Sequence, residues 1–370
     1  MKPNDRSRFL RLLPVIFLLA GMNLSATTVL WLAPDGRDDA PGTQERPLAT
    51  LAGAKAALRE LVQKGLKDDV AVRLRGGTYS LTETLELTPG ELGDGHYGVT
   101  FMSHHGEKAV ISGARALQAG WRQVQENGTL WVLALPEARQ GGWVFRSLFR
   151  AGESLPRARE PDAGYYTVAQ VADERRRLIL NEKLPAGWSA LTGVELNTTA
   201  YWHFNRQPVA EITETGVLAR RGIGSDVSGA RISEKSHSRV WLENALAFAD
   251  TPGEWFLDTA AGELYYRAAP GEDPNRLAFA APVLRELIVV RGAPDRVARN
   301  VQFRNLELAE TDWELPAEGR LGVQAGAWAF DRSRTFSPGA ALRFIYARDL
   351  RVKGCRFRDL GDGAVSFEIG

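Results

Sequence analysis

The sequence predicts an all-β protein built around a solenoid of stacked coils, and three observations predict this fold class. Short runs such as residues 70–74 alternate apolar and polar side chains, and glycine-rich turns separate them. Residues 300–308 align with residues 349–357 at an offset of 49, with apolar positions matched. Residues 341–344 align with residues 364–367 at an offset of 23, which is a suitable length for one solenoid coil. A β-sandwich with coincidental spacing is the alternative.

A bend is expected at equivalent places in the first alignment. Asn305 and Gly354 occupy the same position, between two short apolar alternations. Both residue types tolerate left-handed backbone angles, so each can join two strands of one coil. Leu306 and Cys355 then share the next inward position, and we expect Cys355 to be a core residue rather than a nucleophile.

One long helix is expected, after a short strand at 29–32 and a polar loop at 35–47. Thr50 is a suitable N-cap, and Gly65 lies where a terminating glycine belongs. The apolar residues between them share one helical face; they are Leu51, Ala54, Leu58, Leu61 and Val62. We expect this helix to cap the N-terminal end of the solenoid.

The solenoid pattern is interrupted in the middle of the chain. Residues 115–280 are rich in Trp and Tyr and contain alternating strands, but they show no 23-residue repeat. The expected organisation is therefore a signal peptide at 1–26, an N-terminal cap with the first coils at 27–114, an inserted β-rich module at 115–280, and the start of the main solenoid at 281–370.

The first 26 residues have the features of an export signal. A basic start precedes an apolar run at 12–22, and small residues follow at Ser25 and Ala26. The run is short for a membrane span, although an uncleaved anchor is the alternative. The sequence thus predicts a secreted or periplasmic protein with no membrane attachment after signal cleavage.

Composition excludes several classes of function. Lys plus Arg (46) nearly balances Asp plus Glu (45), so there is no polycationic footprint for a nucleic acid. One cysteine and five histidines leave no material for a multi-cysteine zinc site or a histidine-rich metal centre. We expect no metal, no cofactor and no nucleic-acid partner.

Several segments resemble known protein families. Residues 31–36, 41–43, 47–51 and 74–79 look like the opening of exported parallel β-helix proteins. Further segments resemble glycoside hydrolase family 141, and they lie at 146–149, 156–159, 242–244, 252–258, 262–266, 281–284 and 311–313. The Pro-Gly-Glu-Trp stretch at 252–255 and the Leu-Tyr-Tyr stretch at 264–266 are the more specific of these matches. The resemblance spans residues 29–370.

This resemblance implies a right-handed, pectin-lyase-like β-helix with an inserted β-sandwich-like module. It also implies hydrolysis of a plant or microbial polysaccharide through two carboxylates, with fucosidase and xylanase activities among family members. The family's presumed catalytic carboxylates lie in later coils. We therefore expect the catalytic pair beyond residue 370, assign no catalytic residue, and expect the 370-residue chain to be inactive. A polysaccharide lyase or uronate epimerase on the same fold and a non-catalytic glycan-binding protein are the alternatives.

Outward carboxylates and one aromatic ring in the C-terminal coils are the candidate glycan contacts. Asp312 and Asp362 lie in loops where a groove would form, and Glu368 alternates with apolar neighbours on a strand. Trp313 lies beside Asp312 and can stack on a sugar ring. Trp202 is a second candidate for stacking. A solvated polar face for the acids and core packing for the rings are the alternatives.

Overall fold

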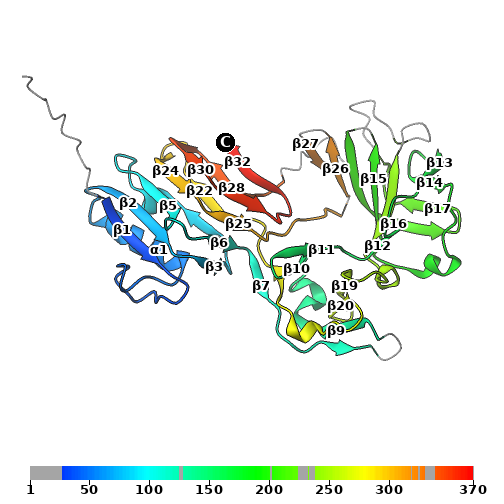
Figure 1. Ribbon diagram of the computed structural model, residues 1–370. Helices are drawn as coiled ribbons and strands as arrows, with labels where there is room; N and C mark the ends of the chain where they lie inside the picture. Colours follow the sequence, from blue (N-terminus) through cyan, green and yellow to red (C-terminus); the bar gives the residue numbers. More distant parts are fainter. Residues whose placement is uncertain are drawn as a thin grey trace, which may run out of the picture.

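The computed structural model describes residues 27–124, 128–200, 202–223, 232, 238–317, 319–323, 326–329 and 338–369. The expected signal peptide at 1–26 lies outside these residues. Figure 1 shows a stack of coils at the left, a broad sheet at the right, and a smaller group of strands below and between them. Among the described residues, no helix has the length and apolar character that a membrane span requires.

The stack of coils consists of three sheets whose strands run parallel. The first sheet contains β1 (Thr27–Leu32), β2 (Asp69–Leu74), β5 (Val99–Ser103), β24 (Val301–Arg304) and β30 (Arg351–Lys353). The second contains β3 (Gly77–Ser80), β6 (Ala109–Ser112), β25 (Glu307–Ala309) and β31 (Arg356–Arg358). The third contains β4 (Leu85–Leu87), β22 (Ile288–Arg291), β28 (Ala340–Ile345) and β32 (Gly363–Glu368). A short parallel pair lies at one corner, formed by β23 (Ala298–Arg299) and β29 (Ala347–Arg348). Successive coils therefore stack as in a β-helix.

The strand register confirms both repeats found in the sequence. Gln302 on β24 pairs with Arg351 on β30, an offset of 49 residues. Leu342 on β28 pairs with Val365 on β32, an offset of 23 residues. The longer offset includes an excursion of the chain, from which β26 (Arg320–Val323) and β27 (Gly326–Ala329) form an antiparallel pair. The two offsets are thus the same coil with and without an insertion.

The expected bend in each coil is also present. Asn305 and Gly354 have left-handed φ angles of 55° and 65°. A Cβ atom on Gly354 would lie 2.3 Å from Oδ1 of Asn305, so glycine is required where the asparagine side chain packs against the next coil. Cys355, just after this bend, is half-buried and packs against the core of the β-helix.

The expected helix is α1 (Leu51–Gln63). The Thr50 side chain accepts a hydrogen bond from the N–H of Gly53, which confirms the predicted N-cap. Gly65 follows the helix with a φ of 83°. A second helix of four residues, α2 (Pro89–Leu92), was not predicted; a capping box between Thr88 and Glu91 stabilises it.

A single coil of the β-helix is interrupted by the middle of the chain. Strands β5 and β6 supply two sides of that coil, and β22 supplies the third. Strand β22 pairs in parallel with β4 of the preceding coil and with β28 of the next. The chain therefore leaves the β-helix after β6 and returns to complete the same coil.

Antiparallel sheets make up the intervening region. One contains β7 (Ala114–Ala116), β21 (Phe279–Pro282), β10 (Leu148–Arg150) and β11 (Glu153–Leu155). Another contains β8 (Arg122–Gln123), β9 (Leu130–Ala134), β20 (Glu263–Arg267) and β19 (Trp255–Asp258). The broad sheet contains β12 (Arg159–Glu160), β18 (Arg239–Glu243), β15 (Glu195–Ala200), β16 (His203–Thr213), β17 (Gly216–Ala219), β14 (Arg177–Leu180) and β13 (Val168–Ala172). Short 3₁₀ turns connect these strands at Pro136–Gly141, Ala186–Ala190, Leu246–Phe248 and Pro274–Arg276.

The broad sheet also recruits a strand from the segment expected to form only solenoid. Strand β26 pairs with β16 in an antiparallel register, with Arg206 opposite Arg320. The free edge of β16 offers unpaired backbone groups, and β26 satisfies them. The broad sheet and the β-helix are thus connected through residues 320–323 as well as through the two ends of the intervening region.

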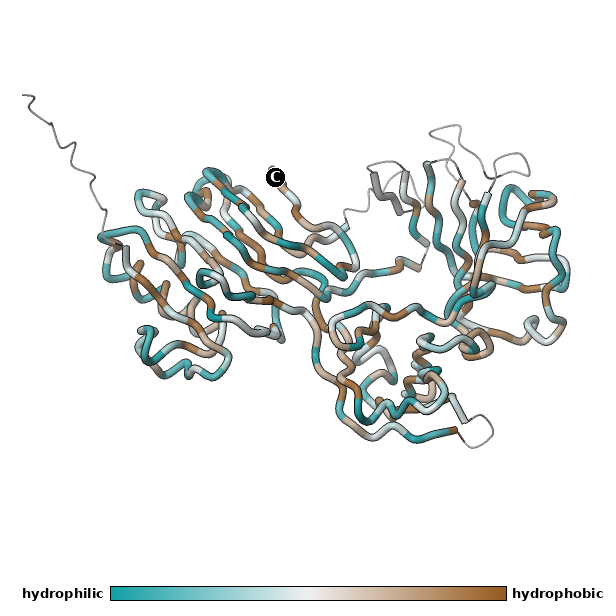
Figure 2. The backbone as a smooth tube through the Cα atoms, in the orientation of Figure 1, coloured by the Kyte–Doolittle hydropathy of each residue, from teal (hydrophilic) through white to brown (hydrophobic). Residues whose placement is uncertain are grey.

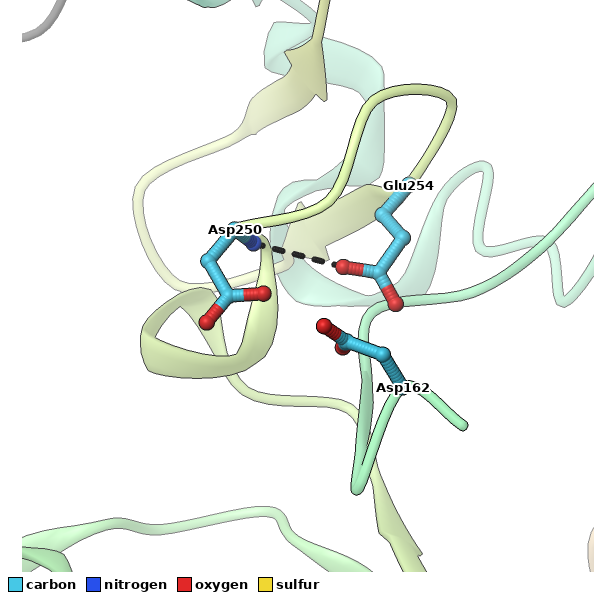
Figure 3. Close-up of side chains that lie close together, drawn as sticks. All are labelled: Asp162, Asp250 and Glu254. Atoms are coloured by element: carbon cyan, nitrogen blue, oxygen red, sulfur yellow. Dashed lines mark hydrogen bonds between the residues drawn. The ribbon is translucent and has the colours of Figure 1, made fainter. Parts of the chain in front are cut away.

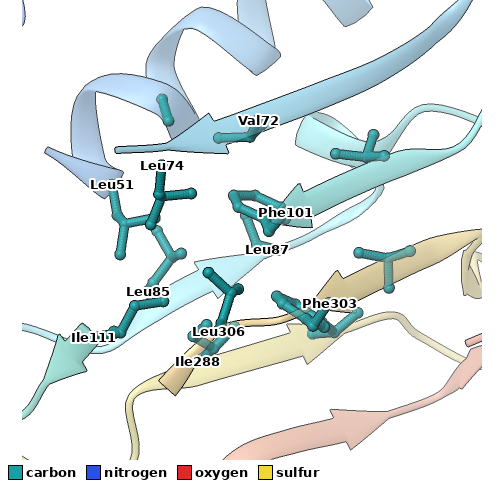
Figure 4. Packing of buried hydrophobic residues seen from close by; sticks show 14 of the residues in the cluster. Leu51, Val72, Leu74, Leu85, Leu87, Phe101, Ile111, Ile288, Phe303 and Leu306 are labelled. Carbon is teal, nitrogen blue, oxygen red and sulfur yellow. The ribbon is translucent and has the colours of Figure 1, made fainter. Parts of the chain in front are cut away.

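Three hydrophobic cores hold these parts together. The first fills the β-helix and includes Leu74, Phe101 and Phe303, with the two phenylalanine rings stacked at 5.5 Å (Figure 4). The second lies under the broad sheet, and the third lies around Trp255 and Tyr266. Figure 2 shows apolar and polar residues alternating along the coils, as inward and outward side chains of a β-helix require.

Candidate functional site

A pocket of about 840 Å³ opens where corners of successive coils lie on top of one another. Residues near the starts of the four strands of the third sheet contribute to it in coil order: Thr84, Glu286, Gly339 and Asp362. Segments 141–146, 282–285 and 312–315 complete the lining together with Arg343. The pocket therefore joins the β-helix to the first part of the inserted region.

Asp312 is a buried carboxyl group in this pocket, with only 9% of the residue exposed. Its Oδ1 accepts a hydrogen bond from the backbone N–H of Arg146 at 3.0 Å. Among the described residues, no lysine or arginine forms an ion pair with it. Burial raises the pKa of Asp312 to about 6, against the opposing effect of the Arg146 N–H. At mildly acidic pH this group can therefore donate an O–H to a ligand.

Asp362 lies in the same pocket, one coil further along the β-helix. Its carboxylate forms an ion pair with Arg320, and its side chain is only 3% exposed. Burial raises the pKa of Asp362, while the charge of Arg320 opposes that rise. The two coils pack closely here, since a Cβ on Gly361 would lie 2.4 Å from the carbonyl carbon of Asp312. The fold thus brings two predicted contact residues into one pocket with different charge environments.

Trp313 also lines the pocket, but its ring is already contacted by arginines. The guanidinium carbons of Arg146, Arg206 and Arg320 lie 4.3, 4.6 and 5.9 Å from the ring centroid. A guanidinium group over an indole is attracted by the ring quadrupole, and it covers surface on which a sugar would stack. The predicted role of Trp313 as a stacking platform stays a prediction, limited to the part of the half-buried ring that the arginines leave open.

Glu368 contacts the pocket through an arginine. Its two oxygens accept hydrogen bonds from Nε and Nη2 of Arg343, both at 2.6 Å. Arg343 lines the pocket and also binds Glu286 at 2.9 Å. Bidentate geometry fixes the guanidinium group, and the hydrogen bonds from Glu368 raise the pKa of Arg343. Glu368 therefore positions a pocket residue and does not itself line the pocket.

A buried ionic network lies behind Trp313. Glu195 on β15 binds Arg157 at 2.9 Å and also contacts Arg146, while Glu243 on β18 binds Arg206 at 2.9 Å. Burial would raise the pKa of Glu195, but the charges of Arg157 and Arg146 hold it at about 2. Because Arg146 belongs to the pocket and the two glutamates belong to the broad sheet, this network joins the sheet to the pocket.

The arginines of this site were missed in the sequence, and so was Glu195. Nothing in the local pattern around Arg320 or Arg343 indicates that either residue binds a carboxylate many residues away. A signal did exist for Arg146 and Arg157, because both lie within segments that carry the family resemblance. Trp202, the second predicted platform, lies outside the pocket lining and is 51% exposed.

A second group of carboxylates lies away from the pocket. Asp162, Asp250 and Glu254 have oxygens within 4.8 Å of one another, and Figure 3 shows them converging from two segments. Glu254 is only 2% exposed and accepts backbone hydrogen bonds from Arg159 at 3.2 Å and from Thr251 at 3.2 Å. Burial raises the pKa of Glu254 to about 7. Backbone N–H groups thus already occupy the oxygens of the buried member.

Comparison with known proteins supports the fold. No protein-family model matches the chain, and no curated protein does either. A solved structure described as a glycoside hydrolase is similar at a TM-score of 0.73, with 22% sequence identity over 90% of this chain. The chain spans 62% of the length of that structure. The complex structure of XylC with xylose is a weaker match, with a TM-score of 0.39 and 14% identity over 88% of this chain and 40% of the other. The first match shows that this chain has the β-helix fold of that glycoside hydrolase.

Proposed function

We propose that this protein is carbohydrate-active, that its pocket binds a glycan, and that it is a glycoside hydrolase related to family 141. One observation carries the proposal: coil stacking gathers Asp312, Trp313 and Asp362 into one pocket of about 840 Å³. Carboxyl groups that hydrogen-bond hydroxyls, next to an aromatic surface, are what a sugar ring requires. The structural similarity to a glycoside hydrolase supports the same conclusion.

The chemistry assigned to each residue follows from its surroundings. Asp312 offers a protonated carboxyl at mildly acidic pH, because burial holds its pKa near 6. Asp362 offers an oxygen held by Arg320, and Glu368 holds Arg343 toward the pocket. A donor beside an acceptor can bind two hydroxyls of one sugar. The expectation that the hydrolytic pair lies in coils beyond residue 370 stays a prediction.

Two further parts of the proposal concern handedness and location. We take the β-helix to be right-handed, since parallel crossover connections almost always have that hand. We take the protein to be secreted or periplasmic, because residues 1–26 have the composition of an export signal. N-terminal sequencing of protein recovered from the culture medium or the periplasm tests the second point. A protein that starts at Thr27 supports export, and one that keeps Met1 contradicts signal cleavage.

Binding is the decisive test of the pocket. The purified chain is titrated calorimetrically with neutral xylo-oligosaccharides and fucosylated oligosaccharides, as native protein and as Asp312→Asn. We expect binding to weaken about tenfold in the variant, as for loss of one hydrogen bond to a well-placed carboxyl. Asp349→Asn is the matched control, because Asp349 lies at another coil corner with its side chain 68% exposed. Equal loss in both variants, or no binding to any oligosaccharide, contradicts the proposal.

Product analysis separates the alternatives. Reducing ends released by this chain would support a hydrolase and contradict the expectation that its catalytic pair lies elsewhere. Unsaturated products from a uronate polymer would indicate a lyase, because β-elimination leaves a double bond. Binding without any product from a longer form of the protein would indicate a glycan-binding protein without catalysis.

A further inference from the structure

The outer face of the broad sheet carries aromatic and cationic side chains. On β18, Val240 and Leu242 point into the core, whereas Arg239 and Trp241 point away from it. The same alternation places Phe204 and Arg206 outward on β16, because their neighbours on that strand are buried. The outward residues of adjacent strands therefore form a continuous surface.

Three rings on this face form what we call the aromatic strip, made of Tyr165, Trp241 and Phe204. The Tyr165 and Trp241 rings lie 5.6 Å apart, edge to face, and the Trp241 and Phe204 rings lie 6.0 Å apart. Tyr165 is 41% exposed, and the other two are half-buried. The Trp241 indole is fixed, because its Nε1 donates a hydrogen bond to Glu243 at 2.7 Å. The rings are thus held in place with their outer parts open to solvent.

Two arginines cover the same strip without neutralising partners. The guanidinium carbon of Arg239 lies 5.1 Å from the Tyr165 ring, and that of Arg159 lies 5.4 Å from the Trp241 ring. Arg159 donates to backbone carbonyls of Pro161 and Gly164. Within the part of the chain that the structure describes, neither arginine forms an ion pair with a carboxylate. Their positive charge is therefore available to an anion.

The strip is connected to the pocket through one arginine. The guanidinium carbon of Arg206 lies 5.7 Å from the Phe204 ring and 4.6 Å from the Trp313 ring. Trp313 lines the pocket. A polymer seated on the aromatic strip would therefore point toward the pocket.

We propose that the aromatic strip with Arg159 and Arg239 binds an anionic glycan. Rings stack on sugar faces, and guanidinium groups bind carboxylate or sulfate substituents. The nearly balanced charge of the chain, 46 basic against 45 acidic residues, disfavours a polynucleotide as the occupant. This surface is separate from the pocket, so the inference does not require the pocket to act on a sugar.

The test uses affinity electrophoresis of the purified chain through gels that contain polygalacturonate, dextran sulfate or neutral xylan. Native protein is compared with Tyr165→Ser, Arg239→Gln and the control Arg276→Gln, whose side chain is 86% exposed away from the strip. We expect retardation by at least one anionic polymer, with a dissociation constant about tenfold higher in each strip variant and unchanged in the control. Melting curves identify any variant that fails to fold, and Arg239→Gln, at an exposed position, keeps the test valid if Tyr165→Ser fails.

Each outcome supports or overturns the proposal. Retardation by polygalacturonate alone identifies a uronate glycan, and retardation by dextran sulfate alone identifies a sulfated one. Equal retardation by neutral xylan overturns the requirement for negative charge. Strip variants that bind like the native chain place the binding elsewhere. Single-stranded DNA that competes as well as the glycan overturns the assignment to a carbohydrate. The proposed pocket function fails separately, in the calorimetry of Asp312→Asn with neutral oligosaccharides.

Discussion

The carboxylate of Asp312 accepts a hydrogen bond from the backbone N–H of Arg146 at 3.0 Å, across 166 residues of sequence. The contact joins the coil that leaves β25 to the segment that precedes β10. It holds the buried carboxyl at the pocket wall while leaving it without an ion pair among the described residues. The pocket therefore depends on how the inserted region docks on the β-helix, and several measurable consequences follow.

Asp312 should make stability depend on pH. Its folded pKa of about 6 lies above the ordinary value of 3.8, so the folded state binds the proton more tightly than the unfolded state. Its contribution is fully present below about pH 4 and is lost as pH rises through about 6. The loss is about 2–3 kcal/mol. Asp312→Asn should remove this part of the slope in urea unfolding between pH 4 and about 7. An unchanged slope would show that the carboxyl is not perturbed.

Glu254 should produce a similar effect in a different part of the molecule. Burial raises its pKa from 4.5 to about 7, so its contribution is present at acidic pH and is lost as pH rises through about 7. Glu254→Gln should flatten the dependence of Tm on pH between about 5 and 8, since the amide does not titrate. Glu60→Gln is the control, because Glu60 lies on the surface of α1 with its side chain 69% exposed. A slope that survives Glu254→Gln would contradict the assignment.

Removal of the Glu195 charge should strongly destabilise the fold. Arg157 has a side chain only 12% exposed and would lose its bidentate carboxylate. Breaking a buried pair leaves an uncompensated charge, so Glu195→Gln should lower the free energy of unfolding by about 3–5 kcal/mol. The measurement is urea unfolding followed by tryptophan fluorescence. Glu211→Gln, which breaks the more exposed pair with Arg177, should leave the midpoint nearly unchanged. Similar shifts in both variants would rule out a special role for the network.

The contact between adjacent coils at the pocket should be sensitive to a single methyl group. Gly361→Ala would place a Cβ 2.4 Å from both the carbonyl carbon and oxygen of Asp312, and backbone must move to accommodate it. We expect a loss of about 1–3 kcal/mol in stability and weaker glycan binding, because the Asp312 loop is displaced. Gly187→Ala is the matched control, since no atom lies within 4 Å of its Cβ position. Stability equal to that of the control would show that the loop yields without strain.

The repeats in the sequence predicted much of the β-helix. Offsets of 49 and 23 residues became registers between adjacent coils, because parallel stacking repeats the same inward and outward alternation. Thr50 and Asn305 were identified for local reasons, a cap and a left-handed bend. The pairing of β26 with β16 was not predicted, since the partner of an edge strand depends on where the two parts of the chain meet.

The sequence by itself determined the strands, the capping helix, the repeat and the residue types suited to a glycan. These features depend on backbone preferences and on alternation over a few residues, which act locally. Only the tertiary structure decided that Asp312 and Asp362 share a pocket, that arginines contact Trp313, and that Glu368 acts through Arg343. Charge interactions and burial depend on distance in space, and the insertion within one coil sets those distances between residues far apart in the chain.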